Sequence, residues 1–321
     1  MRYALVSMLW LGVSAAALAQ SPAYPDKPVR VLVGYPAGGP TDIIARMFAE
    51  RAGERLHGTF VVENKPGANA VIAAEAVAGA KPDGATLLVA AQAHSMIPAL
   101  YADRVKFDAV KSFAPVCIMG SSPTVLVVRP AFGVKTLAEF LRKVREKPGT
   151  YTYASVGIGS AVHLVTEDFL DVARMQMTHV PYKGAAPAST ALLAGEVDAF
   201  FATVGSVLPQ IRAGRFIPLA VASDRRTELL PDTPTLEEGG VHGVRGDVWY
   251  GLLAPAGTPD TVVRTLQRES EAFSQDPKVR ERLTAAGIEP ASTCGAAFSS
   301  RIANEAAAFT RTAHRLNLKV E

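Results

Sequence analysis

The chain has 321 residues, of which 49% are hydrophobic and 20% are charged, and its formal net charge is +3. This balance is typical of a globular protein long enough for two lobes, and it excludes an intrinsically disordered chain. The basic residues form no stripe, because the densest groups, 142–145 and 224–226, are short and lie beside acidic residues, so we expect no nucleic-acid partner.

The first twenty residues predict where the protein works. Arg2 is followed by an uncharged apolar segment that ends in Ala17-Leu18-Ala19. These are the parts of a secretory signal peptide, so we expect residues 1–19 to be removed after Ala19 and the mature chain to reach the periplasm. Loss of Arg2 leaves 32 basic and 30 acidic residues, a net charge of +2. An uncleaved N-terminal anchor is the alternative, although a spanning helix needs roughly 20 apolar residues.

The next part of the chain alternates strands with helices. Apolar and β-branched segments predict strands at 29–35, 59–63 and 86–91. The spacing of apolar residues predicts a helix over 41–56, and an alanine-rich segment predicts a second helix that ends at 80. Strands and helices joined by short turns are typical of βαβ units and a largely parallel sheet.

The same alternation starts again after residue 135. Strands are predicted at 151–156 and 197–202. Hydroxyl residues predict two capped helices, one from Thr136 to 147 and one from Ser160 to 172. A third helix is expected to end at Leu193.

Two apolar segments are expected to cross between lobes. Residues 113–128 form a long β-branched stretch, interrupted only at 120–123, that can leave one sheet and enter another. Residues 247–253 can make the return crossing, and the last segment, 259–316, is mainly helical.

Two crossings would place both chain ends in one lobe. We therefore predict an α/β protein in which 20–123 and 248–321 form lobe 1 and 124–247 form lobe 2. A single large sheet is the alternative.

Cys117 and Cys294 are the only cysteines. In an oxidising compartment they can form a disulfide, whereas Cys117 alone fits a buried apolar position. Their Cα separation would decide between these interpretations, and the sequence does not contain it.

Two strand–turn–helix junctions resemble each other. The first spans 38–44 and the second 157–164, and each places glycines before a hydroxyl residue, Thr41 or Ser160, that can cap the next helix. Glycine lets the main chain approach a ligand, and a helix start offers unpaired N–H groups and a positive dipole end. One junction in each lobe would let both close on one carboxylate. Alternatively, each merely ends a strand and begins a helix.

Polar side chains near these junctions have more than one interpretation. Asp42 either complements the helix dipole, receives a ligand ammonium group or holds the loop in shape. His163 either reaches back to the cap, as Glu does in a capping box, or lines the pocket. Lys183 is either an anion partner or a solvated turn residue. Asp198 is either an acid at a strand start or the far wall of the pocket.

Patterns typical of catalysis or metal binding are missing. The sequence has no Gly-x-Ser-x-Gly, Ser-x-x-Lys, Cys-x-x-Cys or His-Glu-x-x-His pattern and no Gly-Lys pair. Val162 stands where a dinucleotide fingerprint requires its third glycine, and the six histidines are scattered. We therefore expect no catalytic residue, cofactor or metal.

In addition to these features, the chain resembles the periplasmic solute-binding receptors of tripartite tricarboxylate transporters, known as Bug receptors. The resemblance covers essentially the whole mature chain. Its segments are Tyr24–Arg30, Tyr35–Asp42, Val62–Ala68, Lys81–Gly84, Pro98–Tyr101, His179–Gly184, Gly195–Asp198, Leu230–Thr235 and Trp249–Pro259.

The resemblance implies a two-lobe periplasmic binding protein fold of type II that closes on a small carboxylate, either a dicarboxylate, an amino acid or an aromatic acid. It also implies delivery of this cargo to inner-membrane permease subunits, and we expect a monomer. The positions carried over to the carboxylate site are Gly38, Gly39, Thr41, Asp42, Gly157, Gly159, Ser160 and His163. The same analogy places Tyr182, Lys183 and Asp198 near the far end of the ligand.

The chain departs from the family pattern at two places that flank the expected cleft. Asn69, Ala70 and Ala73 stand where the family usually has further glycines, and Ile97 stands where Asn often precedes Pro98. A cargo that differs from the commonest one is therefore expected. Two alternatives to a transport receptor are a receptor that signals to a sensor kinase and an exported α/β hydrolase or transferase.

Overall fold

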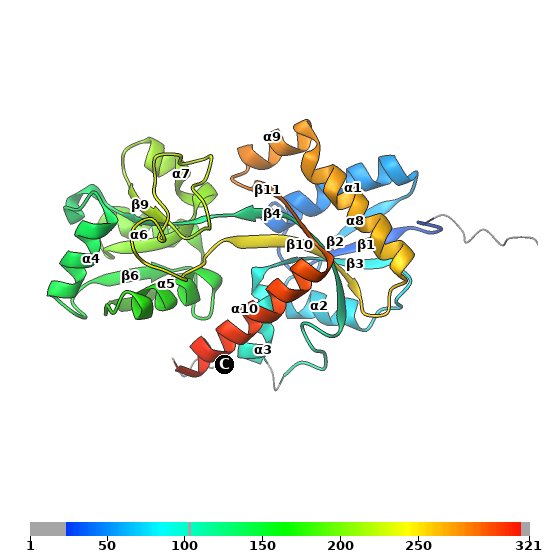
Figure 1. Cartoon of the computed structure of the whole chain (residues 1–321), viewed down its shortest axis with the longest axis horizontal. Helices are drawn as coiled ribbons and strands as arrows, with labels where there is room; N and C mark the ends of the chain where they lie inside the picture. Colours follow the sequence, from blue (N-terminus) through cyan, green and yellow to red (C-terminus); the bar gives the residue numbers. More distant parts are fainter. Residues whose placement is uncertain (1–23, 102–103, 316–321) are drawn as a thin grey trace, which may run out of the picture.

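The computed structural model describes residues 24–101 and 104–315. The expected signal peptide, 1–19, lies outside these residues. Two lobes lie side by side along the longest axis of the molecule, each with its own sheet flanked by helices (Figure 1). The two-lobe α/β architecture is therefore confirmed, and the alternative of a single large sheet is wrong.

The first sheet has six strands and mixed direction. Its order is β11-β4-β10-β3-β1-β2. β1 pairs in parallel with β2 and β3, whereas β10 lies antiparallel between β3 and β4. The strands are β1 (Val29–Val33), β2 (Phe60–Asn64), β3 (Thr86–Ala91), β4 (Phe113–Ser122), β10 (Val248–Pro255) and β11 (Glu289–Cys294).

Six α-helices accompany this sheet in the described parts of the chain. Ile44 and Phe48 of α1 pack on Val31 of β1 and on Phe273 of α8 in one buried core. None of the helices in residues 24–101 and 104–315 is both long enough and apolar enough to cross a membrane. The six helices are α1 (Pro40–Leu56), α2 (Val71–Ala78), α3 (Ile97–Tyr101), α8 (Asp260–Gln275), α9 (Pro277–Ala285) and α10 (Gly295–Arg315).

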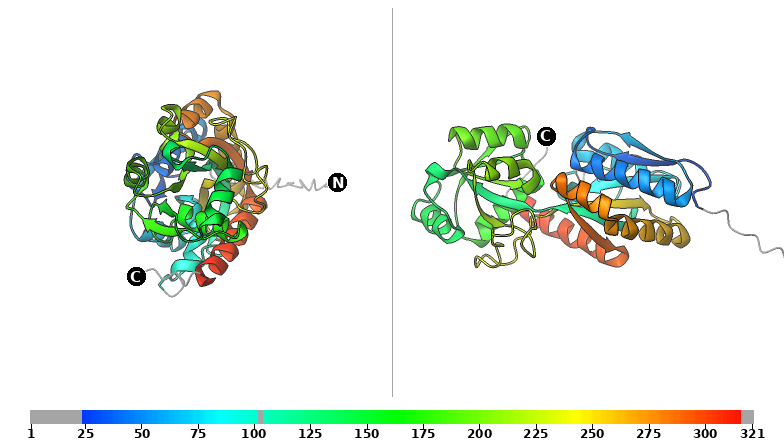
Figure 2. Two further views of the ribbon diagram at one scale, coloured as in Figure 1. Left: turned by 90° about the vertical axis from the view of Figure 1, so that its left-hand side faces the viewer. Right: turned by 90° about the horizontal axis from the view of Figure 1, so that it is seen from above.

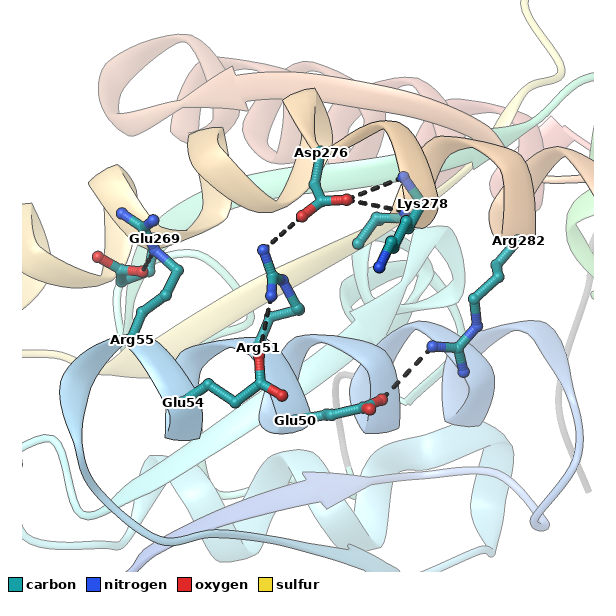
Figure 3. A network of polar contacts seen from close by, with 9 residues as sticks. Glu50, Arg51, Glu54, Arg55, Glu269, Asp276, Lys278 and Arg282 are labelled. Atoms are coloured by element: carbon teal, nitrogen blue, oxygen red, sulfur yellow. Dashed lines mark hydrogen bonds and ion pairs between the residues drawn. The ribbon is translucent and has the colours of Figure 1, made fainter.

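Ion pairs also hold α1 against α8 and α9 (Figure 3). Arg55 Nε lies 2.5 Å from a Glu269 carboxylate oxygen, and Arg51 pairs with Asp276, the N-cap of α9. Because these contacts link α1 to two other helices along its length, they help to fix the direction in which its N-terminus points.

The second sheet has five strands in the order β7-β6-β8-β5-β9. β6 runs parallel to β7 and β8, and β5 runs antiparallel to β8 and β9. The elements are β5 (Thr124–Val128), α4 (Leu137–Glu146), β6 (Thr152–Ser155), α5 (Ala161–Val172), β7 (Thr178–Pro181), α6 (Ala185–Ala194), β8 (Ala199–Thr203), α7 (Val204–Arg212) and β9 (Ile217–Val221). Thr136 and Ser160 cap α4 and α5 as predicted.

In the described residues, two strand crossings and one packed helix join the lobes. β4 leads directly into β5 through Pro123, and β10 returns to the first sheet. The third is α10, which reaches from the first lobe to α5 of the second, as Figures 1 and 2 show from different sides. Phe309 of α10 and Leu164 of α5 share a buried cluster with Leu100 of α3, so apolar packing joins the two lobes beside the strand crossings.

Cys117 and Cys294 form a disulfide. They are directly opposed on the antiparallel strands β4 and β11, with 4.0 Å between their Cα atoms. This register brings the two cysteines close enough to bond, so the disulfide interpretation is confirmed. The bond joins residues 177 positions apart in the sequence.

The turn before α2 holds three consecutive non-glycine residues, Ala68, Asn69 and Ala70, at positive φ, 45°, 51° and 72°. A left-handed L-residue costs about 1–2 kcal/mol. Ala68 is exposed, so Ala68→Gly should remove this cost without losing packing. After the entropy of the added glycine, we expect a gain of about 0.5–1 kcal/mol, or roughly 1–2 °C in Tm by calorimetry.

The control for this substitution is Ala256→Gly. Ala256 is also exposed in a turn but has a negative φ, so the added glycine should lower Tm slightly through backbone entropy alone. Equal effects of the two substitutions would contradict strain at Ala68.

Candidate functional site

The first junction begins α1 one residue earlier than expected. Gly39, with φ −79° and ψ 169°, is the N-cap, and Pro40 occupies the first helical position. The prediction that Thr41 caps this helix is therefore wrong, and Thr41 is instead a buried residue of the first turn. Proline explains the shift, because its fixed φ suits the first helical position and it has no N–H to satisfy.

Asp42 holds the turn in shape. Its buried carboxylate accepts hydrogen bonds from the Gly38 amide at 2.9 Å, Arg46 Nε at 2.9 Å and Asn64 Nδ2 at 2.8 Å. Burial raises the pKa of Asp42, but these hydrogen bonds outweigh burial and lower it below its ordinary value. The carboxylate is thus ionised, and the Arg46 guanidinium compensates its charge where the helix begins.

The second junction is closed by Ser160 and His163. Ser160 Oγ donates to the Gly157 carbonyl at 2.7 Å and accepts from the His163 amide at 3.3 Å. The side chain of His163 reaches back, and its Nδ1 accepts from the Gly159 amide at 3.1 Å. This resembles the predicted capping box, except that the His163 side chain binds the amide of Gly159, one residue before the cap, instead of the amide of Ser160 itself.

A largely buried aromatic stack supports this turn from behind. The ring centroids of His163 and His179 are 4.0 Å apart, and those of His179 and Tyr153 are 4.9 Å apart. Ser155 Oγ donates to the Gly157 carbonyl at 3.1 Å and lies 2.7 Å from His179 Nε2. Because the hydroxyl proton is used in the first bond, we assign the proton of the second contact to His179 Nε2. The turn conformation therefore depends on two histidines.

Both histidines are neutral in the fold. Burial lowers the pKa of His163 to about 4, and burial followed by the neighbouring His163 lowers the pKa of His179 to about 4. Unfolded histidine titrates near 6.5, so the unfolded chain binds more protons between about pH 4 and 6.5. We therefore expect the free energy of unfolding to decrease as the pH is lowered from about 6.5 to about 4, by about 1.4 kcal/mol per pH unit for each histidine. Above this window these groups should have no effect.

Urea denaturation at several pH values measures this dependence. His179→Gln retains a donor toward Ser155 but cannot titrate, so its stability should fall less steeply below pH 6.5 than that of the wild type. His314→Gln, at an exposed position near the end of α10, should keep the wild-type slope. A wild-type slope in His179→Gln would contradict the assignment of this dependence to the stack.

Several glycine amides of the two turns are already used inside the protein. The Gly38 amide binds Asp42, the Gly157 amide binds Ser155 Oγ and the Gly159 amide binds His163. These glycines therefore shape the turns through their own amides, and their contact with a ligand stays a prediction. Helix geometry supplies no carbonyl partner for the next amides along the chain, those of Thr41, Asp42, Ala161 and Val162.

The two junctions open toward the same region between the lobes. β1 and β3 are parallel neighbours, so the turn after β1 and α3 after β3 leave the same edge of the first sheet. α3 in turn meets the second junction, because a Cβ built on Gly159 would lie 3.1 Å from Leu100 Cδ1. Both helix N-termini are thus brought to the interlobe side of their sheets.

The structure places Tyr182 beside the second junction and Asp198 away from it. The Tyr182 amide donates to the Ser155 carbonyl at 3.0 Å, and the exposed Lys183 follows. Asp198 precedes β8 and accepts from the amide of Thr152, at the start of β6. Parallel strands keep this end of the sheet apart from the Gly157 turn, so Asp198 fits the interpretation as an acid at a strand start.

Four residues that hold the site in place were missed. Asn64 and Arg46 fix Asp42, and Ser155 and His179 fix the second turn. The i,i+4 spacing of Asp42 and Arg46 on a predicted helix was a signal that could have found that pair. The others come from separate elements, and no local spacing reveals them.

Comparisons with known proteins give consistent matches. The family model described as the tripartite tricarboxylate transporter family receptor matches residues 44–318. A UPF0065 protein of Bordetella pertussis is 36% identical over 278 residues, 86% of this chain and 85% of that protein. The protein BugT of the same species is 30% identical over 290 residues, 89% of each chain.

Solved structures match over similar lengths. A solute-binding protein from Polaromonas, described as TctC and without ligand, has a TM-score of 0.83 at 28% identity and covers 91% of this chain and 99% of its own. MatC from Rhodopseudomonas palustris, with bound malate, has a TM-score of 0.73 at 30% identity, covering 90% and 99%. A second R. palustris protein, with adipate, has a TM-score of 0.76 at 30% identity, covering 92% and 100%.

Proposed function

This chain belongs to the tripartite tricarboxylate transporter receptor family, and from that membership we propose that it captures a small carboxylate between its lobes. Members of this family are periplasmic solute-binding proteins. The observation that carries the proposal is the pair of helix N-termini, of α1 and α5, on the interlobe side of the two sheets. Two relatives of known structure hold dicarboxylates, malate and adipate.

The carboxylate is held by main-chain amides. In this proposal Thr41 and Asp42 of α1 bind one oxygen, and Ala161 and Val162 of α5 bind the other. A charge-assisted hydrogen bond contributes about 1.5–3 kcal/mol, and micromolar affinity requires about 8 kcal/mol. Four such bonds, helped by two helix dipoles, suffice after ordering costs. The charge of Asp42 does not repel the ligand strongly, because Arg46 compensates it at 2.9 Å.

The far end of the ligand lies toward Tyr182 and Lys183. Both follow β7, beside the second junction, and Lys183 is exposed. A second carboxylate of the ligand would meet the Lys183 ammonium there. Asp198 takes no part in this arrangement, because it lies at the other end of the strands.

The receptor works after export. We propose that the signal peptide is cleaved after Ala19, that the mature monomer binds its cargo in the periplasm without transforming it, and that it delivers the cargo to the membrane subunits of its transporter. Delivery needs no chemistry at the site, and the groups assembled there are amides, hydroxyls and neutral imidazoles rather than an activated nucleophile.

A thermal-shift screen tests this function. The panel contains malate, adipate, benzoate and amino acids, each beside its neutral amide, and the same mixtures are followed by NMR for turnover. We expect saturable stabilisation by at least one acid, none by its amide and no change in the acid. Equal stabilisation by acid and amide would contradict the anion site, and turnover would contradict a receptor.

A further inference from the structure

A cavity of about 410 Å³ lies between α10 and α5. Leu164, Val165 and Asp168 of α5 form one wall, and Phe309 is among the α10 residues opposite. Of the residues in the two junctions described above, its lining includes only Leu164, the last residue of the second, and its volume is typical of small-molecule sites. Because α10 belongs to the first lobe and α5 to the second, any occupant would contact both.

The cations that line this cavity are already paired. Arg301 binds Asp247 at 2.8 Å and Glu305 at 2.9 Å, so it carries two carboxylate partners. Arg245 binds Asp224 at 3.2 Å. An anionic ligand would therefore have to displace two carboxylates from Arg301, whereas the exposed pair of Arg245 with Asp224 is weak.

Two hydrogen-bond acceptors of the lining are the Asp168 carboxylate and the side-chain oxygen of Gln92. Arg311 and Arg315 line an adjoining hollow together with Asp168, but among the described residues no basic nitrogen lies within 4 Å of its carboxylate. Burial raises the pKa of Asp168, and Arg315 offsets this only in part. Gln92 is 2% exposed, and its side-chain oxygen has no hydrogen-bond partner among the described residues. A buried acceptor without a donor is costly, and a ligand with N–H groups would relieve that cost.

We propose that this cavity binds a small organic cation, a primary ammonium group on a short apolar body. The ammonium group donates to the Asp168 carboxylate and to the side-chain oxygen of Gln92. The apolar body packs on Leu164, Val165 and Phe309. The Asp168 carboxylate and the Gln92 oxygen, together with the apolar walls, favour a cation with an apolar body over an anion or a fully polar ligand.

Calorimetric titration with benzylammonium tests the proposal, with benzyl alcohol and benzoate as isosteric neutral and anionic controls. We expect saturable binding of benzylammonium alone. Asp168→Asn should weaken it at least about tenfold, the value of one hydrogen bond to a charged group. Asp260→Asn is the control, since Asp260 is an exposed carboxylate at the start of α8 and outside this cavity, and it should change the affinity less than about twofold.

Three outcomes would overturn the proposal. One is the absence of saturable binding to the wild-type protein, and another is equal affinity of the wild type and Asp168→Asn. The third is loss of benzylammonium binding in Gly39→Val, which would place the amine in the carboxylate site. Retained binding in Gly39→Val would support a separate site, whether or not the carboxylate proposal holds.

Discussion

Replacing Gly39 with valine is expected to weaken carboxylate binding about 100-fold while the Tm of the unliganded protein stays unchanged. Gly39 has an extended backbone, and a Cβ built there meets only the Pro36 carbonyl, at 3.8 Å, so the fold accepts a side chain. The valine methyl groups would occupy the space in front of α1 and keep the ligand from the amides of Thr41 and Asp42. Losing two such bonds costs about 3 kcal/mol, which calorimetric titration with the tightest acid of the screen would detect.

Two other substitutions make this result specific. Gly159→Val places a side chain at φ 71° and against Leu100, so it should lower the Tm of the unliganded protein as well as affinity. Lys183→Ala removes an exposed charge, and we expect it to weaken binding less than about tenfold. Unchanged affinity in Gly39→Val, or a larger loss in Lys183→Ala, would mean that side chains rather than main-chain amides hold the acid.

Removing the disulfide is expected to lower the free energy of unfolding by about 4 kcal/mol. The bridge joins residues 177 positions apart, so it restricts the unfolded chain strongly. Cys117 is fully buried, and Cys117→Ala/Cys294→Ala therefore tests the bridge better than a reductant acting on the folded protein. Urea denaturation of the double variant beside the oxidised wild type measures the loss.

The control for this comparison is a reductant present throughout denaturation. It should lower the urea midpoint of the wild type toward that of the double variant and leave the double variant unchanged. Identical midpoints for the oxidised wild type and the double variant would show that the bridge adds no stability.

Local signals predicted helix starts well where a hydroxyl cap is present. Thr136 and Ser160 each accept a hydrogen bond from the amide three residues on, an interaction that depends only on neighbouring residues. α1 begins at Gly39 and Pro40 instead, because proline at the first position removes the need for a side-chain cap.

Strand pairing over long distances could not be predicted in the same way. β11 was missed because Glu289–Cys294 lacks an alternation of apolar residues. Its position at the edge of the first sheet depends on pairing with β4 and on the disulfide. β9 was missed as well, in a strand that contains Pro218. The antiparallel insertion of β10 between β3 and β4 depends on partners more than 120 residues away.

The site was predicted at the level of its two helix starts and not at the level of single hydrogen bonds. Glycines before a helix indicate a turn, but whether Gly38 or Gly159 has a spare amide depends on Asp42 and His163 folding back. The contribution of His179 requires β6 and β7 to be neighbours, which only the fold establishes. The lobe boundaries at 123 and 248, and the ligand contacts, stay predictions.

The order of strands has a consequence for how the chain acquires its structure. All five strands of the second sheet lie within residues 124–221, whereas β10, the central strand between β3 and β4, begins only at Val248. Because the chain is synthesised from the N-terminus, it can complete the second sheet before the first. Until β10 is made, β3 and β4 are left with open edges that invite wrong pairing. During synthesis, the N-terminal part of the first lobe is therefore the part that most needs a chaperone, although it is made first.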